Sequence, residues 1–145
     1  MSVHDGPVAE LTIQGPRGVA DVWDRYVRPA RWPEWSPQIR GVRYGHSTLR
    51  AGTDGVVTGP FGLGVPFRIL EVEDGDPARR WWTWEVRLPG LRVLGLTLRL
   101  EHEVESRAPR EGGGTLTRWR IHGPALVVLA YRPLAALALR RLVST

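Results

Sequence analysis

His102 is the side chain of this sequence with the clearest potential for chemistry. It occupies an apolar position in an alternating stretch, with Leu100 and Val104 on the same face. An imidazole titrates near neutral pH, so it can act as a general acid or base or hydrogen-bond a ligand. An isolated histidine without a partner is more often a buried structural residue. The sequence leaves both interpretations open.

Tyr131 is the second candidate catalytic residue. It lies shortly before Pro133 in a long apolar stretch, where a proline can kink a helix. Such a kink would turn the phenol toward a ligand, although a kink without any functional purpose is equally compatible with the sequence. The sequence therefore offers His102 and Tyr131 as two groups able to transfer a proton.

Aromatic side chains form the second group of candidates, because the 145 residues include seven tryptophans. Trp82 and Trp84 alternate onto one face of a predicted strand, and Trp119 can join them from another strand. Stacked indoles make a rigid wall suited to flat ligands, and they serve core packing equally well. Trp35, three residues after Trp32, is expected to clamp a short helical segment at the sheet rim or to border a pocket mouth.

The remaining candidate ligand contacts are less specific; they are Phe67, Arg68, Glu71 and Leu100. Glu71 in a cavity would need a partner or would have a raised pKa. Arg68 can be that partner only if a β-bulge brings both residues to one side of the sheet.

Metal and nucleotide cofactors are not predicted. The four histidines show no ligand spacing, and Glu101 and Glu103 alternate in direction with His102, so the three cannot share an ion. Neither a phosphate-binding loop nor a glycine-rich dinucleotide motif follows a strand. The absence of cysteine also excludes disulfides and thiol nucleophiles.

The charge of the chain is +5, and all twenty basic residues are arginine. Two explanations are open. A GC-rich genome favours arginine codons, and a surface that binds an acidic partner needs positive charge. Nucleic-acid binding is disfavoured because the tryptophans occupy apolar faces and the arginines polar ones. The N-terminus lacks the features of a secretory signal, which predicts a cytoplasmic location.

The stretch from residue 124 to 143 is almost wholly apolar, but Arg132 and Pro133 interrupt its middle. A membrane span tolerates central charge poorly, so a buried helix is the better interpretation. A helix that is apolar on nearly every side must be wrapped by other elements. The preceding chain therefore has to supply a curved sheet.

The patterns elsewhere predict that sheet. Strands are expected at residues 8–14, 39–47, 55–60, 65–73, 80–88, 94–107 and 115–122. An amphipathic helix opens at Gly15-Pro16 and ends at Pro29, with Asp21–Arg25 and Asp24–Arg28 pairs on its solvent side. One or two helical turns follow within residues 31–39, and a bulge is predicted near Leu70.

These segments resemble those of the START-like superfamily known as SRPBCC, and most of all its polyketide cyclase/dehydrase family. The motifs that carry the resemblance are V-W-D at Val22–Asp24, W-x-x-W-S-P at Trp32–Pro37, A-G-T at Ala51–Thr53 and G-G-T-L-T at Gly113–Thr117. The resemblance spans nearly the whole chain. It implies one α+β helix-grip domain over residues 1–145, with an apolar pocket between a curved antiparallel sheet and the C-terminal helix.

Three functions are compatible with this reading. The resemblance implies that the chain would be a cyclase, aromatase or dehydratase that folds a polyketide in its pocket, docks an acidic acyl carrier protein and uses His102 and Tyr131. The alternative is a non-catalytic carrier of a lipid or another hydrophobic ligand. The third is an interaction protein whose core is filled by Trp82, Trp84 and Trp119. A monomer and a homodimer through an exposed first strand are both compatible with the pattern.

Overall fold

The computed structural model describes residues 9–59, 62–87 and 97–144. Within these ranges the chain forms a seven-stranded antiparallel sheet in the order β1-β7-β6-β5-β4-β3-β2. The strands are β1 Ala9–Gly15, β2 Gly41–Tyr44, β3 Asp54–Thr58, β4 Gly64–Asp76, β5 Arg79–Arg87, β6 Thr97–Ser106 and β7 Thr115–His122. The helices are α1 Val19–Val27, α2 Trp32–Trp35 and α3 Ala125–Val143, with short 3-10 turns η1 Pro29–Arg31 and η3 Pro109–Glu111.

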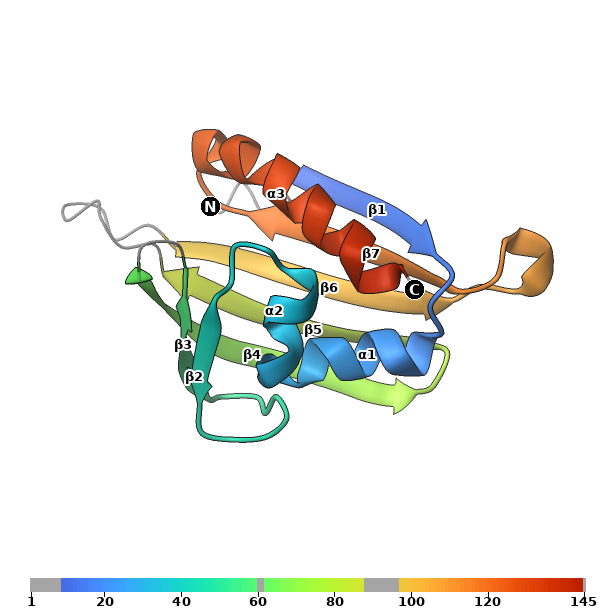
Figure 1. The fold of residues 1–145 in the computed structure, drawn as a ribbon, viewed down its shortest axis with the longest axis horizontal. Helices are drawn as coiled ribbons and strands as arrows, with labels where there is room; N and C mark the ends of the chain where they lie inside the picture. Colours follow the sequence, from blue (N-terminus) through green and yellow to red (C-terminus); the bar gives the residue numbers. More distant parts are fainter. Residues whose placement is uncertain (1–8, 60–61, 88–96, 145) are drawn as a thin grey trace, which may run out of the picture.

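All the helices that Figure 1 labels lie on one side of the curved sheet, so the predicted helix-grip α+β fold is confirmed. The predicted faces are confirmed on the central strands as well. On β7 the side chains of Thr115, Thr117, Trp119 and Ile121 are buried, and those of the alternating residues are partly exposed. Alternation assigns faces correctly because successive Cβ atoms of a strand point to opposite sides.

The predicted bulge is present in β4. The register against β5 slips between Ile69 and Glu71, so Ile69 pairs with Trp84 and Glu71 pairs with Thr83. Since a one-residue slip moves a side chain to the other face, the bulge sends Glu71 to the outer side. Without the bulge, Glu71 would continue the inward set of Phe67 and Ile69.

The short helix α2 is fastened to the end of α1 by two indoles. Trp32 Nε1 donates to the carbonyl of Tyr26 at 2.8 Å, and Trp35 Nε1 donates to that of Arg25 at 3.1 Å. The last carbonyls of a helix lack partners within the helix, and these two are satisfied by the tryptophans. Trp32 and Trp35 therefore do fasten the short helical segment, but to α1, whereas the sequence analysis expected a clamp against the sheet rim.

Helix α3 packs on the sheet with one face only. Val128, Ala135, Ala138, Leu139 and Leu142 are buried. The opposite face is exposed and includes Leu129, Leu134 and Leu137. The sequence-based expectation of a helix wrapped on nearly every side thus holds for its inner face alone. In the part of the chain that the structure describes, no helix is long and apolar enough to cross a membrane.

The C-terminal end of α3 is anchored to α1 by Arg25. This residue was expected on the solvent side with Asp21, but it is buried, and its Nη1 donates to the carbonyls of Arg141 at 2.9 Å and Leu142 at 2.8 Å. A cation there matches both the unpaired carbonyls and the negative end of the helix dipole. The other predicted pair is confirmed, with Arg28 and Asp24 2.6 Å apart.

Candidate functional site

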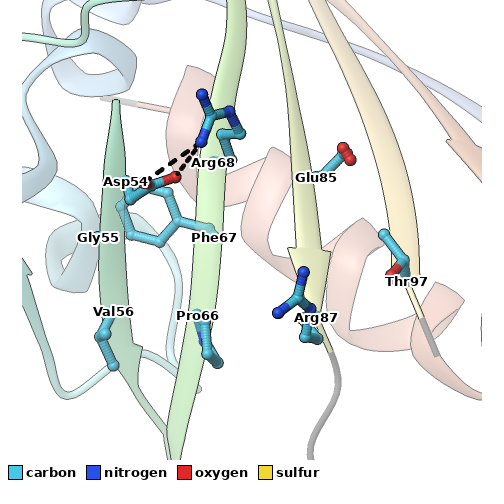
Figure 2. Close-up of a pocket in the computed structure, with 9 residues that line it drawn as sticks. All are labelled: Asp54, Gly55, Val56, Pro66, Phe67, Arg68, Glu85, Arg87 and Thr97. Carbon is cyan, nitrogen blue, oxygen red and sulfur yellow. Dashed lines mark hydrogen bonds and ion pairs between the residues drawn. The ribbon is translucent and has the colours of Figure 1, made fainter. Parts of the chain in front are cut away.

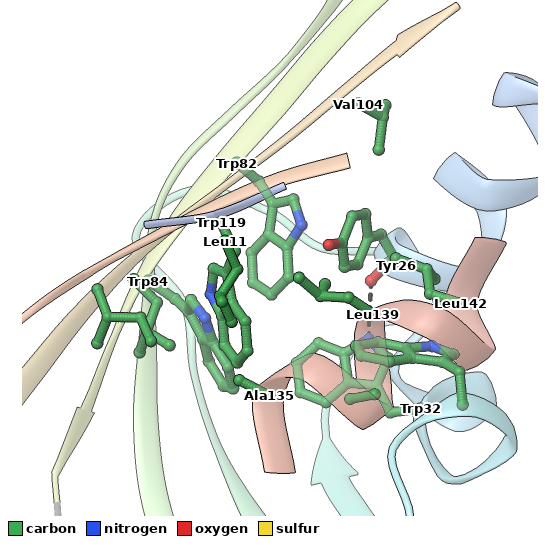
Figure 3. Packing of buried hydrophobic residues seen from close by; sticks show 14 of the residues in the cluster. Leu11, Tyr26, Trp32, Trp82, Trp84, Val104, Trp119, Ala135, Leu139 and Leu142 are labelled. Carbon is green, nitrogen blue, oxygen red and sulfur yellow. Dashed lines mark hydrogen bonds between the residues drawn. The ribbon is translucent and has the colours of Figure 1, made fainter. Parts of the chain in front are cut away.

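The space between the sheet and α3 has two ends, and the end nearest α1 is filled with aromatic rings. Trp82, His102 and Trp119 lie side by side on β5, β6 and β7. The His102 ring stacks on Trp82 with centroids 4.4 Å apart, and on Trp119 with centroids 5.0 Å apart. Figure 3 shows Trp82, Trp84 and Trp119 on the sheet side, facing Leu139 and Tyr26.

Hydrogen bonds determine which ring nitrogen of His102 donates and which accepts. Trp84 Nε1, which can only donate, lies 2.9 Å from His102 Nε2, so Nε2 is the acceptor. The proton of the neutral ring is therefore on Nδ1, which lies 3.2 Å from the Tyr26 hydroxyl. Burial without a charged partner holds the pKa of His102 well below its usual value. His102 is thus a neutral imidazole with both nitrogens engaged.

The network continues beyond Tyr26. Its hydroxyl lies 3.2 Å from Thr117 Oγ1, which in turn donates to the carbonyl of Glu103 at 3.3 Å. If Tyr26 accepts from His102, it donates to Thr117, and every proton in the chain has a partner. Burial also raises the pKa of Tyr26, so its phenol stays protonated. A satisfied buried network of this kind specifies one side-chain arrangement.

Little free space remains at this end. A residual hollow of about 20 Å³ lies among the rings, and the predicted contacts Trp35, Trp82, Trp119 and His102 line it together with Trp84 and Tyr131. Trp32 stacks on Trp82 with centroids 5.8 Å apart, and Tyr26 meets Trp35 edge-on at 5.4 Å. This end has room for at most a water molecule.

The other end of the space is hollow. A cavity of about 180 Å³ lies between the strands and the first turns of α3. Its lining residues are Gln38, Ile39, Val57, Gly59, Leu63, Val65, Trp84, Val86, Leu98, Leu100, Val127 and Tyr131. None of these described lining residues carries an acid or a basic side chain. Leu63 is 51% exposed and marks the mouth.

Two polar side chains interrupt the apolar wall of this cavity. Gln38 Nε2 donates to the Tyr131 hydroxyl at 3.1 Å. Burial raises the pKa of Tyr131, which keeps the phenol neutral, and its ring meets Trp119 edge-on at 5.8 Å. Gln38 Oε1 is buried and has no partner among the described residues. Of the two predicted catalytic residues, Tyr131 thus lines the cavity and His102 lies behind it.

A larger hollow of about 490 Å³ lies on the outer side of the sheet, opposite α3 (Figure 2). Arg68 lines it and pairs with Asp54 at 3.2 Å, and Glu85, Arg87 and Thr97 lie on the neighbouring strands. Among its described lining residues, two acidic and two basic side chains balance in charge. It is a solvated, charged face, and we do not assign it the ligand site.

Arg68 and Glu71 therefore do not reach the inner cavity, which corrects their predicted position. The bulge at Leu70 does bring both to one side of the sheet, but that side is the outer one. Phe67 points inward and is buried against Trp32 and Trp84, at ring distances of 5.6 and 5.4 Å. It lies behind the cavity wall and does not line the hollow between the sheet and α3.

The outer face of β6 carries an ion-pair cluster. Glu103 is buried between Arg79 and Arg118, the latter 2.9 Å away. Burial would raise the pKa of Glu103, but hydrogen bonds from both arginines outweigh it and lower the pKa. Glu101 and Glu103 face outward and His102 inward, as their alternation predicts. Within the described ranges, no three His, Asp or Glu side chains are close enough to hold a metal ion.

Three of the predicted site residues line the cavity, namely Trp84, Leu100 and Tyr131. Sequence reasoning missed Gln38, which lies in the connection between α2 and β2. Nothing in its spacing marks it, because the residue belongs to no periodic element. The W-x-x-W-S-P motif just before it was the nearest available signal.

Comparison with known proteins supports the fold. No family model matches the chain, and no curated protein matches its sequence. Several solved structures do match the chain, in their fold. A hypothetical protein from Helicobacter pylori matches with a TM-score of 0.67 and 18% identity over 93% of this chain and 83% of its own. A protein from Nitrosospira multiformis matches with a TM-score of 0.71 and 13% identity over 93% of this chain and 92% of its own.

A third match is Ara h 8.0201, which has a Bet v 1-like fold. Its TM-score is 0.64, with 15% identity over 92% of this chain and 96% of that one. At these identities the likeness concerns the fold alone. The chain therefore has a Bet v 1-like helix-grip fold, and the resemblance to the SRPBCC superfamily and its polyketide cyclase family stays a sequence-based prediction.

Proposed function

We propose that this protein binds a small hydrophobic molecule in the cavity between the sheet and α3. The observation that carries the proposal is the wall of that cavity. It is apolar except for one neutral pair of polar side chains, and it is open at Leu63. A concave apolar site with a few polar groups is the usual form of a small-molecule site. The Bet v 1-like fold shared with Ara h 8.0201 agrees with this function.

Of the functions considered from the sequence, non-catalytic binding fits the geometry best. The wall offers no charged acid or base among the described residues, and His102 uses both ring nitrogens within the network. The filled end favours an interaction protein with a closed core, but the hollow end has space that such a protein does not need.

A polyketide cyclase or dehydratase is the second candidate, supported by the Tyr131 hydroxyl on the cavity wall. In that case confinement would bring an enol carbon and a carbonyl carbon of the substrate together. As the C–C bond formed, the enol O–H would lose its proton to solvent, and Tyr131 would donate a proton to the developing alkoxide and regain one from solvent. An acidic acyl carrier protein would deliver the chain to the mouth. Incubation with a poly-β-ketone thioester tests this candidate. We expect the same rate and products of cyclisation as without protein, whereas an acceleration that disappears in Tyr131→Phe would favour the enzyme.

Paired substitutions on β3 test the binding proposal. Val57 lines the cavity, and its neighbour Val56 faces the outer side of the same strand. Val57→Phe should fill the cavity, and Val56→Phe should add the same volume outside it. The probe is p-xylene, followed by ligand-observed NMR and by the rise it causes in the unfolding midpoint.

We expect p-xylene to bind the wild-type protein and Val56→Phe, and to lose at least tenfold in affinity for Val57→Phe. Both variants must first unfold cooperatively near the wild-type midpoint. Equal binding to all three proteins would show that this cavity is not the site. Absence of binding to the wild-type protein would contradict the proposed function for ligands of this size.

A further inference from the structure

The polar pair Gln38–Tyr131 indicates what kind of polar group the ligand carries. The two side chains come from different parts of the fold, the connection after α2 and the helix α3. Their hydrogen bond of 3.1 Å uses one amide atom of Gln38 and the oxygen of Tyr131. The second amide atom, Oε1, is buried without a partner. A buried polar atom costs free energy unless it is paired, so a ligand atom that pairs it gains affinity.

The pair offers at least one donor and one acceptor, whichever way the amide is oriented. With Nε2 toward Tyr131, Gln38 Oε1 is the free acceptor and the Tyr131 O–H is the free donor. If the amide is rotated by half a turn, Tyr131 donates to Oε1, Nε2 becomes the free donor and the phenol oxygen the free acceptor. The complementary group must therefore both donate and accept.

Position and size restrict the ligand further. Gln38, Trp84 and Tyr131 line both the cavity and the 20 Å³ hollow behind it, so the polar pair lies at the inner end. The exposed Leu63 lies at the mouth. The cavity volume of about 180 Å³ is close to the roughly 150 Å³ that accepts benzene in a well-studied engineered cavity. One substituted ring fits inside, and anything larger must extend past the mouth.

We infer that the ligand is a small apolar molecule, the size of one substituted ring, whose single neutral hydroxyl group binds between Gln38 and Tyr131. The hydroxyl donates to one side chain and accepts from the other, and the apolar body points toward Leu63. This inference rests on the proposed function. A carboxylate or an ammonium group is disfavoured, because no charged side chain among the described lining residues would compensate it.

The test compares p-cresol with p-xylene, which has nearly the same shape but a methyl group in place of the hydroxyl. The measured quantity is the ratio of the two Kd values, obtained by ligand-observed NMR titration. Each Kd is determined for the wild-type protein, Tyr131→Phe, Gln38→Leu and the double variant. Val65→Ala is the matched control, since Val65 lines the same cavity without a polar group. Unfolding midpoints verify that every variant is folded.

We expect the Kd of p-cresol divided by the Kd of p-xylene to rise by about threefold to tenfold in each single variant and by more than tenfold in the double variant. The Kd of p-xylene should stay within about threefold in the polar variants, and Val65→Ala should leave the ratio unchanged. The anion p-toluate should bind at least tenfold more weakly than p-cresol to the wild-type protein.

An unchanged ratio in the double variant, with p-xylene still bound, would overturn this inference and leave the proposed function intact. Tighter binding of p-toluate than of p-cresol would also overturn it, because the pair would then recognise an anion. If neither p-cresol nor p-xylene binds the wild-type protein, the proposed function and this inference fail together.

Discussion

The two ends of the space between the sheet and α3 are built from the same strands and yet differ in content. At the end near α1, Trp82, His102 and Trp119 stack across three strands and leave about 20 Å³. At the other end, Val86 and Leu98 occupy the equivalent inward positions of β5 and β6, and about 180 Å³ remains. The difference in side-chain volume between the two rows decides where a ligand can be held.

The two ends of α3 differ in the same sense. Its C-terminal end is tied to α1 by Arg25, and to the chain before α1 by the backbone N–H of Arg17, which donates to the Val143 carbonyl at 3.0 Å. Its first turns supply Val127 and Tyr131 to the cavity wall and expose Leu129. One end of the molecule is therefore closely packed, and the other contains the cavity to which we assign the proposed binding; function and stability often require different packing.

The largest effect should come from deleting a ring of the filled end. We expect Trp82→Ala to lower the free energy of unfolding by about 3–5 kcal/mol, because it removes a large buried side chain and leaves a cavity. Val86→Ala, four residues further along the same face, should cost only about 1 kcal/mol, since its side chain already borders empty space. Urea unfolding measures both. Similar losses at the two positions would contradict the division into a filled and a hollow end.

The anchor of α3 should give the next largest effect. Arg25→Met removes two hydrogen bonds from a charged group to the carbonyls at the end of α3, which should cost about 2 kcal/mol. Arg28→Met, which loses only an exposed ion pair between the residue after α1 and Asp24 of α1, should cost less than about 0.5 kcal/mol. Chemical unfolding of both variants checks this. A loss from Arg28→Met as large as that from Arg25→Met would remove the special role of the anchor.

Two tyrosine substitutions sharpen the comparison with a single-atom change. Tyr26→Phe leaves His102 Nδ1 without an acceptor in a fully packed region and should cost about 1–2 kcal/mol. Tyr131→Phe should cost less than about 0.5 kcal/mol, because the cavity can solvate Gln38. The unfolding free energies at pH 7 measure the difference. If Tyr131→Phe were the costlier change, the network at the filled end would not be the stabilising one.

The smallest expected effect is a pH dependence. The pKa of His102 is lowered on folding, so below its unfolded value of 6.5 the unfolded chain binds a proton that the folded protein does not. Stability from this group is complete above that pH and falls as the pH decreases through it. We expect a loss of about 1 kcal/mol between pH 7.5 and 5.5.

The control for this titration is His102→Phe, which keeps every other titrating group. The difference between its unfolding free energy and that of the wild-type protein should change by that amount over the same pH range. A pH-independent difference would mean that His102 is not held neutral in the folded protein.

Much of the fold was predictable because it depends on local rules. The bounds of β7 agree with the predicted strand, and the alternation of His102 between Glu101 and Glu103 predicted their opposite faces correctly. The bulge at Leu70 was also visible, since the inward and outward sets of β4 do not separate around it. The direction in which the bulge turned Glu71 was not, because it depends on the pairing with β5.

The candidate site was less predictable. The tryptophans were assigned to the right face, but the alternation of one strand does not tell whether rings from three strands will meet and fill the space. Gln38 carried no signal, because its connection has no periodicity. Arg25 was placed on the solvent side, since its i, i+4 spacing from Asp21 is the pattern of an exposed pair.

The sequence by itself determined the elements and their faces, because strand alternation and helical periodicity are properties of the local backbone. Only the tertiary structure decided which end of the interior is filled, that Arg25 anchors α3, and that Gln38 meets Tyr131. Each of these depends on distances between segments far apart in the chain, and such distances follow from the register and curvature of the whole sheet.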